Sequence, residues 1–90
     1  MFPKTLFGRT TRPAARTVVP TEFGNVVLDE GKGRYWHLND SALTILRRLD
    51  EGGSDAEAAH DLVTQFQIDH STAARDVEST RHQLREVGLL

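Results

Sequence analysis

The hydrophobic positions of the chain follow two different periods. In its first half, short runs rich in β-branched or aromatic residues occupy residues 16–19, 25–29 and 34–38. Runs of this length and composition are typical of β-strands. A turn at residues 22–25 and a loop at residues 30–33 with two glycines separate the runs. We therefore predict three short strands in an antiparallel meander.

The third predicted strand holds the only tryptophan and the only tyrosine of the chain, side by side. Successive side chains of a strand point to opposite faces of the sheet. Tyr35 and His37 are therefore expected on one face, and Trp36 and Leu38 on the other.

The second half shows the spacing of amphipathic helices, which we predict at about residues 40–50, 54–66 and 70–86. The signals that begin or end these helices are Asn39 or Asp40, Gly52-Gly53, a capping box from Ser54 to Glu57, Asp69 and Gly88. The expected buried stripes are Ala42, Ile45, Leu46 and Leu49, then Ala59, Leu62, Val63 and Phe66, then Ala73, Val77, Thr80, Leu84 and Val87. Leu89 and Leu90 are expected to fold back as an apolar plug.

Together these elements predict an α+β, winged-helix-like fold, with a three-stranded antiparallel sheet followed by a three-helix bundle. Ninety residues are enough for one domain. We place this domain at residues 15–90. Residues 1–14 contain Lys4, Arg9 and Arg12 without any acidic residue, and we predict that they form a flexible basic arm.

Charge and composition exclude several classes of protein. The first sixteen residues carry four basic and no acidic side chains, whereas the rest carry seven basic and thirteen acidic ones. An acidic body argues against general nucleic-acid binding, which depends on neutralising phosphates. No apolar run approaches the roughly 20 residues that span a bilayer. We expect no secretory signal, because the N-terminal stretch has no apolar core long enough for one. The lack of cysteine fits a reducing compartment, so we expect a cytoplasmic protein without a membrane partner.

Residues that could carry catalysis or bind a metal do not form a recognisable site. The four histidines are His37, His60, His70 and His82, and no two of them have the i, i+4 spacing of a helical metal clamp. The paired carboxylates lie at element ends or on polar helix faces, where capping or solvation explains them. No serine has the flanking residues of a nucleophile elbow. We therefore expect no enzyme activity, no metal and no cofactor.

A three-stranded sheet leaves two strands at its edges, and the third strand is one of them. An edge strand presents unpaired N–H and C=O groups, with which an extended peptide can pair. The sequence therefore suggests a protein that binds a peptide by β-strand addition.

The sequence resembles the PqqD-like peptide-recognition family, also called RiPP recognition elements, and within it the small stand-alone members of lasso-peptide biosynthesis. The resemblance covers about residues 17–90. The motifs that carry it are Val27-Leu28-Asp29, the string from Gly33 to Asn39, the string from Leu49 to Ser54, Ala74-Arg75-Asp76-Val77 and the ending from Leu84 to Leu90.

The resemblance implies a function. Members of this family bind the leader segment of a ribosomally synthesised precursor peptide and present it to a modifying enzyme. In the lasso systems this enzyme is a leader peptidase of the transglutaminase-like cysteine-protease type, and a macrocyclase is a further partner. The leader is expected to lie beside the third strand, in a groove against the third helix. Leader side chains are expected to be hydrophobic anchors.

On this basis the candidate peptide-binding residues are Arg34, Tyr35, Trp36, His37, Arg75, Asp76, Ser79, His82 and Gln83. Trp36 fits core packing equally well, because it shares a face with Leu38. Arg75 and Asp76 either pair with charges of the leader or only solvate the helix.

Two alternatives stay open. The first is a winged-helix DNA-binding module, in which the basic arm supplies the phosphate contacts. The charges of the third helix cancel and the second helix has no basic residue, so neither helix is built to lie against phosphates. The second is a homodimer formed by edge-strand pairing or by exchange of the arm.

Overall fold

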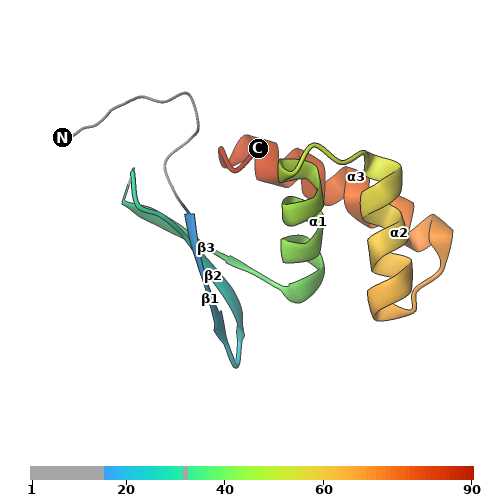
Figure 1. The fold of residues 1–90 in the computed structure, drawn as a ribbon, viewed down its shortest axis with the longest axis horizontal. Coiled ribbons are helices and arrows are strands. Elements are labelled where there is room, and N and C mark those ends of the chain that lie inside the picture. The colour runs from blue at the N-terminus through green and yellow to red at the C-terminus, as the bar shows by residue number, and fades with distance from the viewer. Residues whose placement is uncertain (1–15, 32) are drawn as a thin grey trace. The chain divides into compact units, whose positions relative to one another are not determined.

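The computed structural model describes residues 16–31 and 33–90, and the predicted basic arm at residues 1–14 lies outside them. The chain divides between His37 and Leu38 into two compact units. The first unit contains the strands and the second contains the helices (Figure 1). This order of elements confirms the α+β class, with three antiparallel strands followed by three helices.

The three strands are β1 (Arg16–Thr21), β2 (Gly24–Asp29) and β3 (Arg34–Leu38). They form one sheet in the order β1-β2-β3. β1 runs antiparallel to β2 along its whole length, from Arg16 opposite Asp29 to Thr21 opposite Gly24. The sequence placed all three strands. β1 is two residues longer than predicted and β2 begins one residue earlier, because the turn between them closes to two residues.

Side-chain and glycine chemistry explains the two connections in the sheet. In the first turn, the Thr21 hydroxyl donates to the Gly24 carbonyl at 2.9 Å and accepts from the Phe23 N–H at 3.1 Å. In the second connection, the Gly33 N–H donates to the Asp29 carbonyl at 2.9 Å. Gly33 has a φ of +66°, a left-handed conformation that glycine adopts without steric cost.

β1 contains a proline, Pro20, which pairs in register with Asn25. Proline has no N–H to donate, so within sheets it occurs on edge strands with the missing donor facing away from the ladder. β1 keeps all six of its pairs with β2, which is how a proline of this orientation behaves. The outer edge of β1 is therefore short of a hydrogen-bond donor.

The three helices are α1 (Asp40–Asp50), α2 (Asp55–Phe66) and α3 (His70–Glu86), and each begins at a side chain that the sequence singled out. The Asn39 carboxamide accepts from the Ala42 N–H at 2.8 Å, which selects Asn39 as the first cap. Ser54 and Glu57 form the predicted capping box, with bonds of 2.9 and 3.1 Å. Asp69 caps α3.

α1 and α3 end with the same pattern of hydrogen bonds. After α3, the Gly88 N–H donates to the Arg85 carbonyl and the Leu89 N–H to the Leu84 carbonyl, with Gly88 at a φ of +86°. This is a Schellman motif, in which a left-handed glycine lets the chain satisfy the last carbonyls of the helix. It turns Leu89 inward until only 1% of its surface is exposed. The predicted apolar plug is confirmed for Leu89.

The helices of the second unit pack on one another pairwise. Their buried apolar residues are Leu43, Ile45, Leu46, Ala58, Ala59, Leu62, Ala73, Val77, Leu84 and Leu89. Two predicted core positions are wrong, because Phe66 is 37% exposed and Val87 41% exposed. Phe66 is the last residue of α2 and Val87 caps α3, so both lie at helix ends, where the helical period no longer fixes the direction of the side chain.

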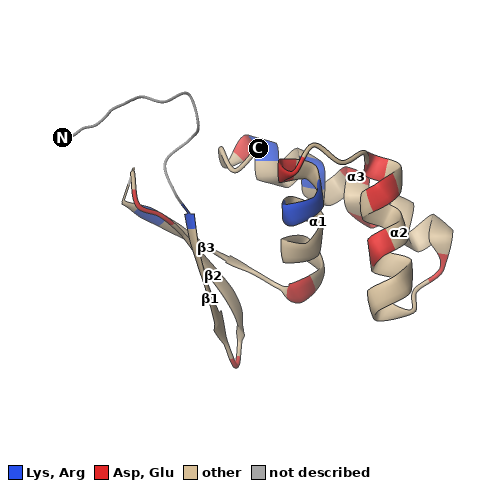
Figure 2. Ribbon diagram, in the orientation of Figure 1, with Lys and Arg blue, Asp and Glu red and all other residues tan. Residues whose placement is uncertain are grey.

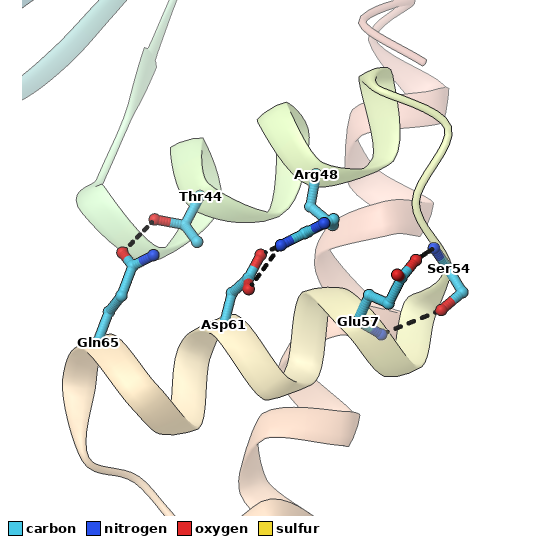
Figure 3. A network of polar contacts seen from close by, with 6 residues as sticks. All are labelled: Thr44, Arg48, Ser54, Glu57, Asp61 and Gln65. Atoms are coloured by element: carbon cyan, nitrogen blue, oxygen red, sulfur yellow. Dashed lines mark hydrogen bonds and ion pairs between the residues drawn. The ribbon is translucent and has the colours of Figure 1, made fainter.

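Polar contacts join α1 to α2 along the side of this core (Figure 3). The guanidinium of Arg48 donates two hydrogen bonds to the Asp61 carboxylate, at 2.8 and 3.0 Å. The Thr44 hydroxyl donates to the Gln65 side-chain carbonyl at 3.3 Å. Bidentate arginine–carboxylate pairs fix geometry as well as adding energy, so this contact sets the alignment of the two helices.

Candidate functional site

β3 is an edge strand of the sheet, because β2 is its only neighbour among the described residues. The predicted alternation of its side chains is confirmed. Tyr35 is 61% exposed and His37 is exposed, whereas Trp36 and Leu38 are half-buried. Arg34 is exposed. Four of the five side chains of β3 were named as candidate peptide contacts.

Side chains on each face of β3 contact one another two residues apart, as a strand requires. The rings of Tyr35 and His37 meet edge to face, with centroids 5.7 Å apart and an interplanar angle of 77°. On the opposite face, the Arg34 guanidinium lies 5.3 Å from the centroid of the Trp36 ring, within the range of a cation–π contact. The two aromatic residues are thus each held by a neighbour on the same strand.

The candidate residues on α3 are all exposed: Arg75, Asp76, Ser79, His82 and Gln83. An open hollow of about 410 Å³ lies along this helix. Its lining residues are Glu78, Ser79, Arg81, His82, Gln83 and Arg85. The structure therefore brings Ser79, His82 and Gln83 together around one hollow. Arg75 and Asp76 are not part of the lining.

Three lining residues, Glu78, Arg81 and Arg85, were not among the candidates. Their charges were considered only as part of the cancelling charge of the third helix, in the argument against DNA binding. Arg81 is engaged within the helical unit, since its Nε lies 3.0 Å from a carboxylate oxygen of Asp55. Figure 2 shows basic and acidic segments mixed among the helices, and α2 carries acidic side chains but no Lys or Arg. Because the hollow is lined by Glu78 as well as by Arg81 and Arg85, it has charges of both signs.

Among the described residues, the shifted pKa values belong to structural contacts. The hydrogen bonds from Arg48 lower the pKa of the Asp61 carboxyl, and the same contact raises the pKa of Arg48. Hydrogen bonds from Ser71 and Thr72 lower the pKa of the Asp69 carboxyl at the start of α3. None of these groups lies on β3 or among the candidate residues of α3.

Residues 16–31 and 33–90 contain no group of three or more His, Asp or Glu side chains placed to hold a metal ion. No described helix is long and apolar enough to cross a membrane. The described candidate residues offer an edge strand, aromatic rings, hydroxyl groups and charges of both signs, all of which can take part in binding. The groove predicted between the third strand and the third helix stays a prediction.

Comparison with known proteins agrees with the resemblance seen in the sequence. The sequence profile of the family described as coenzyme PQQ synthesis protein D (PqqD) matches residues 24–90. A solved structure described as lasso peptide synthetase B1 complexed with the leader peptide is 38% identical, with 86% of this chain and 89% of that chain covered and a TM-score of 0.66.

A second solved structure, TbiB1 in complex with the TbiA(beta) leader peptide, is 24% identical and shares the fold, with 84% of this chain and 88% of that chain covered and a TM-score of 0.66. No curated protein matches the chain significantly. The family match runs from the start of β2 to the last residue, and so includes β3 and all three helices. The chain therefore belongs to the PqqD family and is a PqqD-like RiPP recognition element.

Proposed function

We propose that this protein binds the leader segment of a ribosomally synthesised precursor peptide of the lasso class. The support is its 38% identity, over most of both chains, to a lasso peptide synthetase B1 that was solved with a leader peptide. Among its described residues, the edge strand β3 exposes the side chains of Tyr35 and His37, which suits a carrier of peptides.

We propose further that the leader adds to the sheet as a fourth strand, beside β3. The observation that carries this proposal is the difference between the two edges. The β1 edge includes Pro20, which removes a donor from the ladder that a new strand would need. β3, from Arg34 to Leu38, contains neither proline nor glycine. Pairing of main chains supplies affinity in this binding mode, and side chains supply the choice of peptide.

Within β3, we assign the outward-facing N–H groups to Tyr35 and His37. The loop closes with the Gly33 N–H bonded to the Asp29 carbonyl, and we take Asp29 and Arg34, which end the two strands, to be the first pair of the ladder. The direction of the N–H groups alternates from residue to residue in an antiparallel pair. The leader would then pair with Tyr35 and His37 and leave the bonds to β2 intact.

The exposed residues of α3, from Arg75 to Gln83, are proposed to contact leader side chains and so to select among peptides. The protein is proposed to carry out no chemistry on the bound leader. It delivers the leader to a leader peptidase of the transglutaminase-like cysteine-protease type, and the macrocyclase is a further proposed partner.

The test is a titration of the full chain into a fluorescein-labelled synthetic leader, followed by anisotropy. Wild-type protein is expected to bind with Kd in roughly the nM–µM range, about −8 to −12 kcal/mol. Tyr35→Pro removes the outward N–H and is expected to abolish binding while leaving the helical circular dichroism unchanged.

Tyr35→Ala is the matched control, because it removes the same side chain and keeps the N–H. It is expected to weaken binding by about 10-fold, the loss of one aromatic contact. If both variants lose binding equally, the main chain of β3 makes no separate contribution and strand addition is wrong. If wild-type protein does not bind the leader at tens of micromolar, the proposed function itself is wrong.

A further inference from the structure

β3 carries none of the residues that keep edge strands from pairing with one another. Natural sheets block their edges with proline, with lysine or with a bulge. β3, from Arg34 to Leu38, contains no proline, glycine or lysine. Its one charged side chain is Arg34, the first residue of the strand, and the guanidinium lies 5.3 Å from the centroid of the Trp36 ring. The main chain between Arg34 and Leu38 is therefore able to pair with another strand of the same sequence.

The outward groups of β3 are complementary to themselves. With the outward N–H groups at Tyr35 and His37, as proposed for leader binding, the C=O groups of these two residues point outward as well. Two copies of β3 can run antiparallel with Trp36 opposite Trp36, and Tyr35 of each copy then lies opposite His37 of the other. Every outward N–H and C=O of both strands has a partner in this register. Sliding one strand by two residues in either direction keeps only one such pair within the strands.

The side chains favour the same register. Trp36 meets Trp36 of the second copy in a pair without hydrogen bonds, where the Cα atoms are about 4.5 Å apart, and aromatic pairs directly opposite each other stabilise a sheet. Arg34 lies opposite Leu38 of the second copy, so the two guanidinium groups are at opposite ends of the shared ladder. Parallel pairing in register would instead set Arg34 beside Arg34, which is unfavourable for like charges.

We propose that the free protein pairs with a second copy of itself through β3, antiparallel and centred on Trp36, and that this pairing and a bound leader exclude each other. The exclusion rests on the proposed leader binding at β3, because the outward groups of Tyr35 and His37 cannot serve two strands at once. Self-pairing gives the edge a partner while no leader is present. The leader has to displace the second copy, so the paired fraction of the chain lowers its apparent affinity.

The dimer is weak because its interface is small. Strand pairing is confined to the five residues of β3, and small interfaces are typical of transient encounters. We expect a dimer Kd of roughly 10 µM to 1 mM, above the range expected for the leader. The leader therefore displaces the second copy at equal concentrations.

Single-cysteine variants of the full chain test the register, because the natural chain contains no cysteine. Trp36→Cys is expected to form a disulfide-linked dimer on mild oxidation, because Cβ atoms of directly opposite residues lie about 4.5–5.5 Å apart. Tyr35→Cys is the matched control on the same strand. Its counterpart in the second copy is a diagonal neighbour, about 7–8 Å away, so it is expected to link at least about 10-fold more slowly.

Sedimentation equilibrium of the wild-type chain, up to about 500 µM, measures the dimer Kd with and without saturating synthetic leader. The leader is expected to convert the dimer into a complex of one chain with one leader. Tyr35→Pro removes an outward N–H and is expected to weaken the dimer at least about 10-fold. Phe66→Ser, which removes an exposed aromatic residue from α2, is expected to leave the dimer Kd unchanged.

The outcomes separate this inference from the proposed function. A wild-type chain that stays monomeric up to the highest concentration overturns the inference, and so does a dimer that Tyr35→Pro leaves intact. Equal linking rates of Trp36→Cys and Tyr35→Cys overturn the register. A complex of two chains with two leaders overturns the exclusion and leaves leader binding standing. A wild-type dimer with the expected cross-link that does not bind the leader overturns the proposed function and the exclusion, and supports self-pairing.

Discussion

Replacing Gly53 with alanine is expected to destabilise the helical unit through a contact with Arg48. The Gly53 N–H donates to the Arg48 carbonyl at 2.9 Å in the motif that ends α1. A Cβ at Gly53 would lie 2.7 Å from that carbonyl oxygen and 2.8 Å from the Cγ of Arg48. Atoms cannot approach so closely, so either the end of α1 or the stem of Arg48 has to move. The guanidinium of Arg48 is in turn held by its two bonds to Asp61.

The direction of the stability change distinguishes Gly53→Ala from an ordinary Gly→Ala substitution. Where the backbone suits alanine, a Gly→Ala change stabilises a protein by about 0.4–1 kcal/mol, because it restricts the unfolded chain. Overpacking usually destabilises by about 1–3 kcal/mol, and we expect it to dominate at Gly53. For a domain of this size, each kcal/mol lowers Tm by about 4–8 °C.

Urea denaturation and thermal melting followed by circular dichroism measure the change. Gly52→Ala is the matched control, because its Cβ would meet no atom within 4 Å while its φ of +91° is left-handed. It is expected to cost about 1 kcal/mol from backbone strain alone. In an Arg48→Ala background the side-chain contact is absent and the carbonyl contact stays, so part of the Gly53→Ala penalty should persist. A Gly53→Ala protein as stable as wild type would refute the reasoning.

Two further predictions concern the ends of α3. Asp69 accepts from the hydroxyls of Ser71 at 2.5 Å and Thr72 at 2.6 Å, which hold its carboxyl pKa well below the usual 3.8. Stability from a lowered carboxyl pKa is present above the pKa of the unfolded chain and is lost as the pH falls. The difference in unfolding free energy between wild type and Asp69→Asn should therefore be constant from about pH 7 to 5 and shrink below about pH 4. Urea titrations across this pH range measure the difference, and a difference that stays constant contradicts the prediction. Leu89→Ala should cost about 2–5 kcal/mol, because it empties a buried position, whereas exposed Val87→Ala should cost less than about 0.5 kcal/mol; equal losses of stability would contradict the role of the plug.

The sequence predicted the elements of this fold well because its signals are local. Caps such as Asn39 and Ser54 bond to an N–H three residues away, so spacing alone identifies them. Buried faces were predicted less well. Leu43 and Ala58 are buried although neither was on a predicted stripe. Each helix packs against two others, which makes its buried arc wider than a single line of residues, and periodicity does not show how wide.

Parts of the candidate site were likewise predicted from the sequence, and other parts were not. Alternation along β3 correctly predicted exposed Tyr35 and His37, because exposure follows from the strand period. Ser79 and His82, which were named from the family resemblance, are exposed on α3 as well. Neither the resemblance nor the helical period predicted that Arg81 would line the same hollow, because the position of its side chain also involves Asp55 on another helix. Contact with a leader depends on the peptide as well, and no period in this chain encodes it.

Pro20 also has a consequence for assembly. A sheet in which both edge strands can pair with another strand can add copies of itself without end, as fibrils do. In this protein one rim lacks a donor, so growth by strand pairing would have to proceed through β3 alone. Two molecules joined through β3 would leave only their β1 edges free for pairing, and those edges lack a donor. Strand pairing would therefore stop at a dimer. The proline thus sets an upper limit on the stoichiometry of edge-to-edge self-association.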